Sequence, residues 1–250
     1  MSDSKKTDFG FSDIPLEEKT PKVHGLFSRV ANHYDLMNDL MSLGAHRLWK
    51  HSFIQNLPLC PQQNIIDVAG GTGDIAIGIL KQFSYLQPHV TVCDLTQTMI
   101  DQGRTKALNQ GILKIDWVCG NAEDLPFPDN HFDGYTIAFG LRNVTQKDKS
   151  LQEAVRVLKP GGWYRCLEFS HPQHTTFQKI YDTYSFAVLP KLGQLVANDR
   201  DAYAYLVESI RMFPKQEELC QMMEQAGLTR VKFQNVWDGL VCIHEGTKAP

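Results

Sequence analysis

The feature that most constrains this chain is a short apolar run that leads into closely spaced glycines. Residues 64–69 read Asn-Ile-Ile-Asp-Val-Ala, and Gly70, Gly71 and Gly73 follow at once. A short continuous apolar run is typical of a parallel strand that is buried on both faces. Glycines after such a strand let the backbone pass close to a ligand, because a Cβ atom would block the approach. The pattern predicts a strand, a tight loop over residues 67–74 and a helix that opens from it.

Strands and helices alternate after this loop. Strands are expected at residues 89–94, 115–119, 132–139 and 163–169, and helices at residues 75–83, 97–110 and 147–158. This alternation implies right-handed crossovers and a parallel sheet. Asp238-Gly239, between the apolar runs 231–236 and 240–245, predicts a closing hairpin. We therefore expect an α/β fold with a doubly wound, mostly parallel seven-stranded sheet and an antiparallel edge.

Three segments lie outside this alternation. Residues 1–22 are polar and their prolines would interrupt any helix, so we expect a loosely ordered tail. Residues 23–57 place apolar side chains at three- and four-residue spacing, which predicts short N-terminal helices that cover the sheet. Residues 170–213 are rich in aromatics and long for a connection, so we expect a helical lid insertion after the fifth strand. Residues 23–250 would then form one domain.

Charge and cysteine usage exclude several classes of protein. The formal net charge is −3 and no basic run is present, so a nucleic-acid partner is not expected. The six cysteines form no C-x-x-C pair, which is typical of buried thiols in a reducing compartment. His171 and His174 have no thiol or carboxylate cluster near them, so no metal site is expected. Without a long apolar stretch or a signal-like N-terminus, the chain is expected to be cytoplasmic.

An acidic residue follows the glycine loop at a spacing that suits a nucleoside. Asp94 ends the second strand, 21 positions after Gly73, and an ionised carboxylate there can accept both hydroxyls of a ribose. The run from Gly71 to Ala76 also satisfies the dinucleotide pattern G-x-G-x-x-[GA]. These residues alone leave open a methyl-donor nucleoside, a dinucleotide, or a tight turn that binds nothing.

The order of the motifs favours a methyltransferase over a dehydrogenase. Asp67 stands inside the strand before the loop, so the chain matches the pattern D-x-[GA]-x-G-x-G of class I methyltransferases. Residues 120–127 follow the third strand, where such enzymes hold the adenine. Residues 132–133 then open the fourth strand, residues 156–162 precede the fifth, and dehydrogenases lack these two features. The order resembles the class I, Rossmann-like methyltransferase fold, whose cofactor is S-adenosyl-L-methionine.

Three stretches resemble the ubiquinone/menaquinone biosynthesis C-methyltransferase family. They are residues 34–49, residues 139–144, and residues 156–162 together with 167–170. Similarity continues through residues 184–186, 195–198 and 205–211, so the resemblance covers essentially the whole chain. It implies an enzyme that moves a methyl group from S-adenosyl-L-methionine to a ring carbon of a polyprenylated benzoquinol or naphthoquinol.

The resemblance also places the cofactor contacts. They fall on Thr72, Asp94, Asn121 and Ala122, and Gly71 and Gly73 supply the loop backbone. One position departs from the family. Some bacterial members have a serine where this chain has Ala138, so a cofactor contact through that hydroxyl is not expected.

Three residues are candidates for the chemistry, and each has a structural alternative. Arg142 follows the fourth strand and is permanently cationic, so it can stabilise a phenolate or form a structural ion pair. Tyr34 can donate a hydrogen bond to a quinol oxygen or pack in the core. Glu168 can accept the phenol proton or cap the turn after the fifth strand. His46 and Trp49 lie on one helix face and are expected to pack.

The implied substrate also suggests where the chain works. A long isoprenoid tail stays in the bilayer, so the implied partners are a membrane surface or a quinone-biosynthesis complex. The location would be peripheral on the inner membrane, on the matrix side in a mitochondrion. The sequence does not distinguish a monomer from a homodimer. Two rival interpretations remain because a fold alone does not give a function. They are a methyltransferase of another small molecule and a non-catalytic nucleotide-binding subunit.

Overall fold

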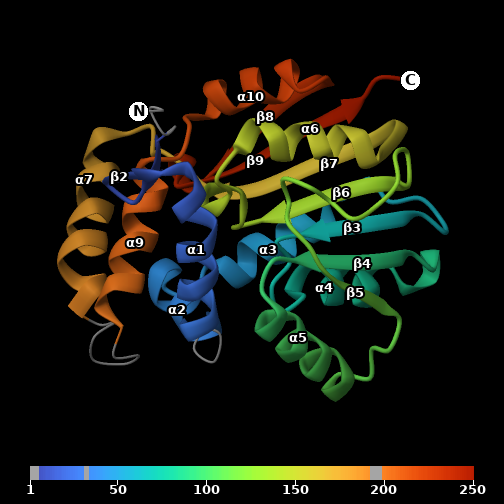
Figure 1. Ribbon diagram of the computed structural model, residues 1–250, viewed down its shortest axis with the longest axis horizontal. Coiled ribbons are helices and arrows are strands. Elements are labelled where there is room, and N and C mark those ends of the chain that lie inside the picture. The colour runs from blue at the N-terminus through green and yellow to red at the C-terminus, as the bar shows by residue number, and fades with distance from the viewer. Residues whose placement is uncertain (1–5, 31–33, 192–198) are drawn as a thin grey trace.

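The structure, a computed structural model, describes residues 6–30, 34–191 and 199–250, without the side chains of residues 34–36, 180 and 188. Its central sheet has seven strands in the order β5-β4-β3-β6-β7-β9-β8 (Figure 1). The strands are β3 (Asn64–Val68), β4 (His89–Asp94), β5 (Ile115–Cys119), β6 (Phe132–Ala138), β7 (Leu158–Phe169), β8 (Leu228–Val236) and β9 (Val241–Lys248). Neighbours from β5 to β7 are parallel. The predicted doubly wound, mostly parallel sheet is confirmed.

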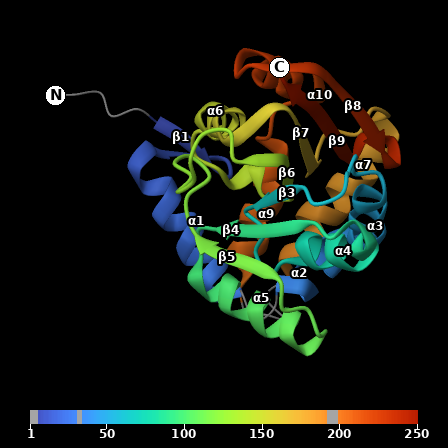
Figure 2. The ribbon, with the colours of Figure 1, turned by 90° about the vertical axis from the view of Figure 1, so that its right-hand side faces the viewer.

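Both faces of the sheet are covered, as the view along its edge shows (Figure 2). Successive strand residues point to opposite faces, so Ile65 and Ile66 of β3 belong to two different core clusters. One cluster joins the strands to α4 (Asp74–Gln82) and α5 (Gln97–Asn109) and to the N-terminal helices. The other joins them to α6 (Lys147–Val157) and α10 (Gln216–Gln225). Burial on both faces explains why the central strands are continuous apolar runs.

The C-terminal pair forms the antiparallel edge that the sequence predicts. β8 and β9 pair as an antiparallel hairpin, with a 3-10 turn at Trp237–Gly239. β9 lies inside the sheet, between β7 and β8, and β8 is the edge strand. The burial of the two strands gives the reason, because Val241 and Cys242 of β9 are fully buried while β8 is half-exposed. The more apolar strand takes the inner position.

The N-terminal segment is more ordered than the sequence suggested. A hairpin of β1 (Lys6–Phe9) and β2 (Ser12–Pro15) precedes α1 (Leu16–Val30), so the expected tail is wrong for residues 6–22. Pro21 lies inside α1, where it removes one backbone hydrogen bond. Packing compensates, because Val23, Leu26 and Val30 bury one face of the helix and the fully buried Lys19 pairs with Asp8 at 3.0 Å. Then follow α2 (Tyr34–Ser42) and α3 (His46–Gln55), the helices expected within residues 23–57.

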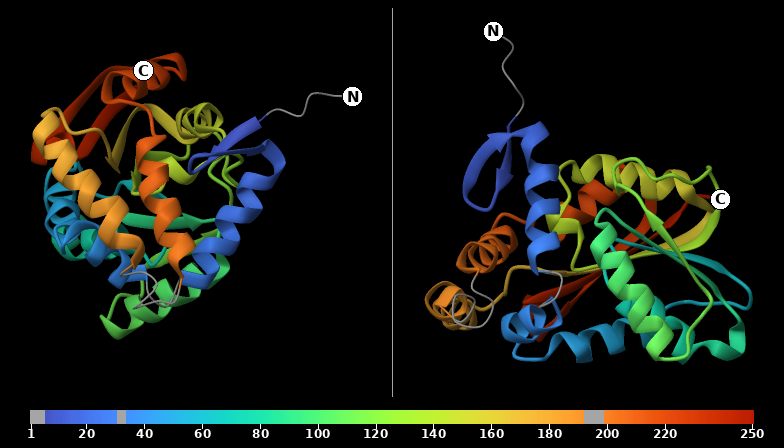
Figure 3. Two further views of the ribbon diagram at one scale, coloured as in Figure 1. Left: turned by 90° about the vertical axis from the view of Figure 1, so that its left-hand side faces the viewer. Right: turned by 60° about the horizontal axis from the view of Figure 1, so that its bottom comes forward.

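The insertion after β7 is helical, as expected, within the part that the structure describes. It contains α7 (Thr175–Thr183), which continues into a π-helical turn (Tyr184–Val188), and α9 (Arg200–Arg211). Residues 195–198, which carry part of the family resemblance, lie outside the described residues. The inserted helices stand beside α1 and α2 (Figure 3). Phe9 stacks on Tyr205 at 4.3 Å, and the Tyr184 hydroxyl donates to the Leu40 carbonyl at 2.6 Å.

The topology fixes where a ligand can bind. β3 is the first strand of the central sheet along the chain and pairs with both β4 and β6, so the strand order reverses at this point. In open α/β sheets, ligands bind outside the carboxyl ends of the strands at such a switch point. Within residues 6–30, 34–191 and 199–250, no helix is long and apolar enough to cross a bilayer.

Candidate active site

A cavity of about 700 Å³, partly open to solvent, lies at the carboxyl ends of the central strands. Small-molecule ligands bind preferentially in clefts at the switch point of an α/β sheet. The loops after four parallel strands line it, and α1 supplies a further wall. The lining residues are Ala69 and Gly71 after β3; Asp94, Leu95, Thr96 and Met99 after β4; Gly120, Asn121, Ala122 and Glu123 after β5; Phe139, Gly140, Asn143, Val144 and Thr145 after β6; and Thr20, Val23 and Phe27 of α1.

Asp94 is held firmly at the edge of this cavity. Its Oδ2 accepts a hydrogen bond from the Gly71 backbone N–H at 2.8 Å, and its Oδ1 accepts one from the Thr96 N–H at 2.9 Å. Burial raises the pKa of the Asp94 carboxyl, against the lowering effect of the two backbone donors. Each carboxylate oxygen has a second lone pair, so the side chain can still accept from a ligand hydroxyl. The side chain is therefore positioned for the ribose contact that the sequence predicts.

The glycine loop owes its shape to two close approaches. Gly73 has φ +77° and precedes α4, and a Cβ there would lie 2.5 Å from the Trp117 ring. A Cβ on Gly70 would lie 2.7 Å from Asp67 Oδ2. Gly71 lines the large cavity, whereas Thr72 and Gly73 do not. Thr72 instead lines a second, smaller cavity of about 280 Å³ on the other side of the loop.

That smaller cavity is polar and charged. Its walls include Lys50 of α3, Asp67 of β3 and Asp74 of α4. Lys50 Nζ contacts Asp74 Oδ2 at 2.7 Å, and Lys106 Nζ contacts Asp74 Oδ1 at 2.6 Å. Burial opposes ionisation of Asp74, but the two lysines outweigh it and hold the pKa of this carboxyl below its usual range. The cavity thus combines fixed charges of both signs beside the glycine loop.

Asp67 is the unusual group in this cavity. The side chain is fully buried; its Oδ1 accepts from the Thr136 hydroxyl at 2.8 Å, and its Oδ2 has no hydrogen-bond partner among the residues that the structure describes. Burial raises the pKa of the Asp67 carboxyl to about 7. A buried oxygen acceptor without a donor is costly unless a ligand satisfies it. An ammonium group is the donor that such a carboxylate favours.

The loops after β5 and β6 are tied together beside the cavity. Asn121 Oδ1 accepts from the Glu123 N–H at 3.0 Å, which fixes the turn that presents Asn121 and Ala122. Glu123 in turn accepts from the backbone N–H groups of Thr145 and Gln146, at 3.0 Å and 3.1 Å. The predicted residues Gly71, Asp94, Asn121 and Ala122 therefore line one cavity.

Arg142 and Glu168 form a buried ion pair. Arg142 Nη1 lies 2.5 Å from Glu168 Oε1, and it also donates to the Phe139 carbonyl at 2.6 Å. Glu168 further accepts from the backbone N–H groups of Arg142, at 3.2 Å, and Phe169, at 2.9 Å. The structural ion pair that the sequence left open for Arg142 is thus present, with Glu168 as its partner. Their roles in the chemistry stay predictions, as does that of Tyr34, whose side chain lies outside the described residues.

The sequence did not point to the wall formed by α1. Thr20, Val23 and Phe27 line the cavity, and the hydroxyls of Thr20 and Thr145 are 2.9 Å apart. Val23 and Phe27 are four apart, which puts them on one helix face. That spacing was a usable signal for the two apolar residues. Thr20 had none, because it falls in the segment that was expected to be a tail.

The architecture and the cavity define a class of protein. The chain resembles a solved structure from Thermotoga maritima described as a SAM-dependent methyltransferase and possible histamine N-methyltransferase. The TM-score is 0.64 at 19% identity, and the match covers 90% of this chain and 99% of the other. At this identity the likeness shows the fold alone, which is that of the class I methyltransferases.

The family follows from the sequence. The model of the ubiE/COQ5 methyltransferase family matches residues 16–248, so the chain belongs to this family and is an S-adenosylmethionine-dependent methyltransferase. It is 50% identical to the ubiquinone/menaquinone biosynthesis C-methyltransferase UbiE of Roseobacter denitrificans, over 98% of each chain. It is 49% identical to the mitochondrial 2-methoxy-6-polyprenyl-1,4-benzoquinol methylase of Drosophila melanogaster, over 98% of this chain and 85% of that protein.

Proposed function

We propose that this chain is the C-methyltransferase of ubiquinone or menaquinone biosynthesis. It transfers a methyl group from S-adenosylmethionine to a ring carbon of a polyprenylated benzoquinol or naphthoquinol. The observation that carries this proposal is identity of about half the residues, along nearly the whole chain, with proteins named for these reactions. The cavity at the switch point supports it, because Asp94 and Asn121 present polar groups in a mainly apolar cleft.

The two cavities divide the cofactor between them. Asp94 accepts the ribose hydroxyls, and Asn121 and Ala122 flank the adenine. Asp67 and Lys50, which line the smaller cavity beside the glycine loop, would face the ammonium and carboxylate groups of the cofactor's amino-acid end. Fixed charges of both signs are what a zwitterionic end group requires. Ala138, which also lines this smaller cavity, offers no hydroxyl to it.

The chemistry asks little covalent work of the protein. The cofactor supplies a methyl group on a cationic sulfur. The acceptor carbon of the quinol becomes nucleophilic when an ortho or para hydroxyl loses its proton, because the phenolate moves charge onto the ring. The protein has to hold the two reacting atoms aligned at roughly 3–3.5 Å and to stabilise the phenolate. Arg142 supplies the positive charge, and Glu168, which holds its guanidinium at 2.5 Å, orients it.

Product analysis tests the reaction. The full chain is incubated with methyl-labelled S-adenosylmethionine and, separately, with a reduced polyprenyl benzoquinol and a reduced polyprenyl naphthoquinol. Mass analysis should place one labelled methyl group on a ring carbon of at least one of them. Label on an oxygen, or no label in either quinol while the cofactor binds, contradicts the proposal.

The polyprenyl tail implies where the enzyme meets its substrate. The chain works at a membrane surface or within a quinone-biosynthesis complex, on the inner membrane and on the matrix side in a mitochondrion. The mitochondrial name of the Drosophila melanogaster relative supports a mitochondrial location. Vesicles that contain a reduced polyprenyl quinol should retain the enzyme on flotation better than vesicles without it. Equal retention argues against this location. Sedimentation of the purified chain distinguishes a monomer from a homodimer.

A further inference from the structure

Three buried hydrogen-bond donors near the cavity lack partners. They are Trp49 Nε1 of α3, Arg142 Nε after β6 and Ser170 Oγ at the end of β7; within the described part of the chain, none has an acceptor. The exposed fractions of these residues are 3%, 2% and 1%, so bulk solvent does not satisfy them. A buried donor without a partner costs free energy, and most such groups in native proteins are paired. Such groups call for a ligand that accepts hydrogen bonds.

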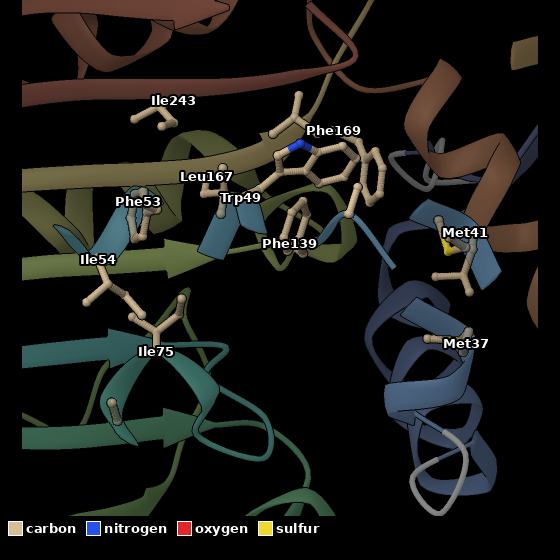
Figure 4. Close-up of a cluster of buried hydrophobic side chains, with 14 of the residues drawn as sticks. Met37, Met41, Trp49, Phe53, Ile54, Ile75, Phe139, Leu167, Phe169 and Ile243 are labelled. Atoms are coloured by element: carbon tan, nitrogen blue, oxygen red, sulfur yellow. The ribbon is translucent and has the colours of Figure 1, made fainter. Parts of the chain in front are cut away.

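Two of the three donors lie against one aromatic ring, and the third belongs to the next residue in the chain. The Trp49 indole packs edge-on against Phe169 at 5.9 Å, and the Arg142 guanidinium carbon lies 5.5 Å from the centre of the Phe169 ring. Ser170 is the next residue in the chain. Phe139 completes the group, 5.0 Å from Phe169 and 6.4 Å from Trp49. Figure 4 shows the three rings together at the ends of β6 and β7.

Phe139 connects this aromatic cluster to the cofactor cavity. It lines that cavity, and its backbone has φ +57°, a strained conformation for a bulky residue. The Phe139 N–H donates to the Leu167 carbonyl at 2.7 Å, which holds the strained turn against β7. Strain of this kind persists where the surroundings enforce it, often at functional sites. Phe139 therefore borders the nucleoside cavity and also packs on the rings of Trp49 and Phe169.

We infer that Trp49, Ser170 and Arg142 form the subsite that recognises the oxygen atoms of the acceptor ring, with Phe139 and Phe169 as its aromatic wall. The inference rests on the proposed function. It assigns a role to Trp49, which the sequence suggested only as a packing residue, and to Ser170, for which the sequence suggested no role. A quinol suits this group, because its ring packs on aromatic faces and its oxygens accept hydrogen bonds. Trp49 and Ser170 act in binding the acceptor, and Arg142 acts in both binding and phenolate stabilisation.

Two conservative variants test the inference. Trp49→Phe keeps an aromatic ring and removes the N–H, and Ser170→Ala removes only the hydroxyl. The acceptor is a short-chain 2-methoxy-1,4-benzoquinol, kept reduced and varied at saturating S-adenosylmethionine. Each variant should raise the KM for this quinol about fivefold to tenfold, the effect of one lost hydrogen bond. The Kd for S-adenosylhomocysteine, measured by calorimetry, should stay within twofold of the wild type.

The chain offers matched controls. Trp163 is also buried, and its Nε1 has no partner among the described residues, but it lies on the part of β7 that pairs with Gly134, far from the strand ends that form the site. Ser150 is a buried serine on α6. Trp163→Phe and Ser150→Ala should leave the KM for the quinol within twofold. An alkylbenzene without ring oxygens, used as a competitive inhibitor, should bind the wild type and Trp49→Phe equally.

The outcomes separate this inference from the proposed function. A wild-type enzyme that does not methylate the quinol overturns both. Normal wild-type turnover, with KM values of Trp49→Phe and Ser170→Ala no higher than those of the controls, overturns the subsite alone. Should Trp49→Phe fail to fold, Ser170→Ala decides, because removal of one hydroxyl leaves the packing in place.

Discussion

At the scale of single residues, the charge state of Asp67 is the feature that most affects cofactor binding. A fully buried carboxyl with one unpartnered oxygen within the described structure stays protonated until about pH 7. In the unfolded chain the same group ionises near pH 4. Between these values the folded state binds the extra proton, so the contribution of Asp67 to stability is largest at low pH and is lost as the pH rises through 7.

Cofactor affinity should show the opposite trend. The ammonium group of S-adenosylmethionine pairs with the ionised carboxylate, so the Kd should fall about tenfold between pH 6 and pH 8, as linkage to a pKa near 7 requires. Calorimetric titrations across this range measure it. Asp67→Asn should bind more weakly and without this pH dependence. An unchanged pH dependence in the variant would assign the titration to another group.

The buried ion pair of Arg142 and Glu168 makes a second prediction at this scale. Removal of one partner leaves the other charge buried, so Glu168→Gln should lower the free energy of unfolding by about 3 kcal/mol. Glu153→Gln is the control, because the Glu153–Arg156 pair is partly exposed and should lose less than about 1 kcal/mol. Urea denaturation compares the two. Equal losses would mean that the Arg142–Glu168 pair contributes no more than a surface contact.

At the scale of elements, α1 shows where sequence patterns fall short. Pro21 and the polar residues around it indicate a tail, yet the helix runs through the proline because its apolar face packs on the rest of the chain. Its other partners come from far along the sequence, such as Asp199, which Arg29 contacts at 3.1 Å. A local pattern cannot report such contacts. The glycine loop was predictable because the residues that form its motif are consecutive in the sequence.

The wall that α1 forms can be tested through cofactor affinity. Phe27→Ala removes a ring that lines the nucleoside cavity, so the Kd for S-adenosylhomocysteine should rise about threefold to tenfold, as expected for loss of buried apolar contact. Tyr85→Ala, at a mostly exposed aromatic residue, should leave the Kd unchanged. If Phe27→Ala binds as tightly as the wild type, α1 covers the cavity without contacting the cofactor.

At the scale of the whole molecule, the parallel part of the sheet could be predicted and the order of its last two strands could not. The alternation of strands and helices gave five parallel strands at nearly their observed positions, because each βα unit follows local periodicity. The position of β9 inside the sheet depends on which strand is more buried, a property of the assembled fold. The same holds for the active site. Asp94 and Asn121 could be placed from motifs, whereas the pairing of Arg142 with Glu168, 26 positions apart, becomes visible only in three dimensions.

The central claim is that the nucleoside of S-adenosylmethionine binds in the cavity against Asp94. Calorimetric titration of the full chain with S-adenosylhomocysteine tests it most directly, beside Asp94→Asn checked for an unchanged fold by circular dichroism. We expect one site per chain in the wild type and a Kd at least about tenfold higher in the variant, because the neutral amide accepts more weakly from the ribose hydroxyls. No heat of binding in the wild type, or equal affinity in both proteins, would contradict the account.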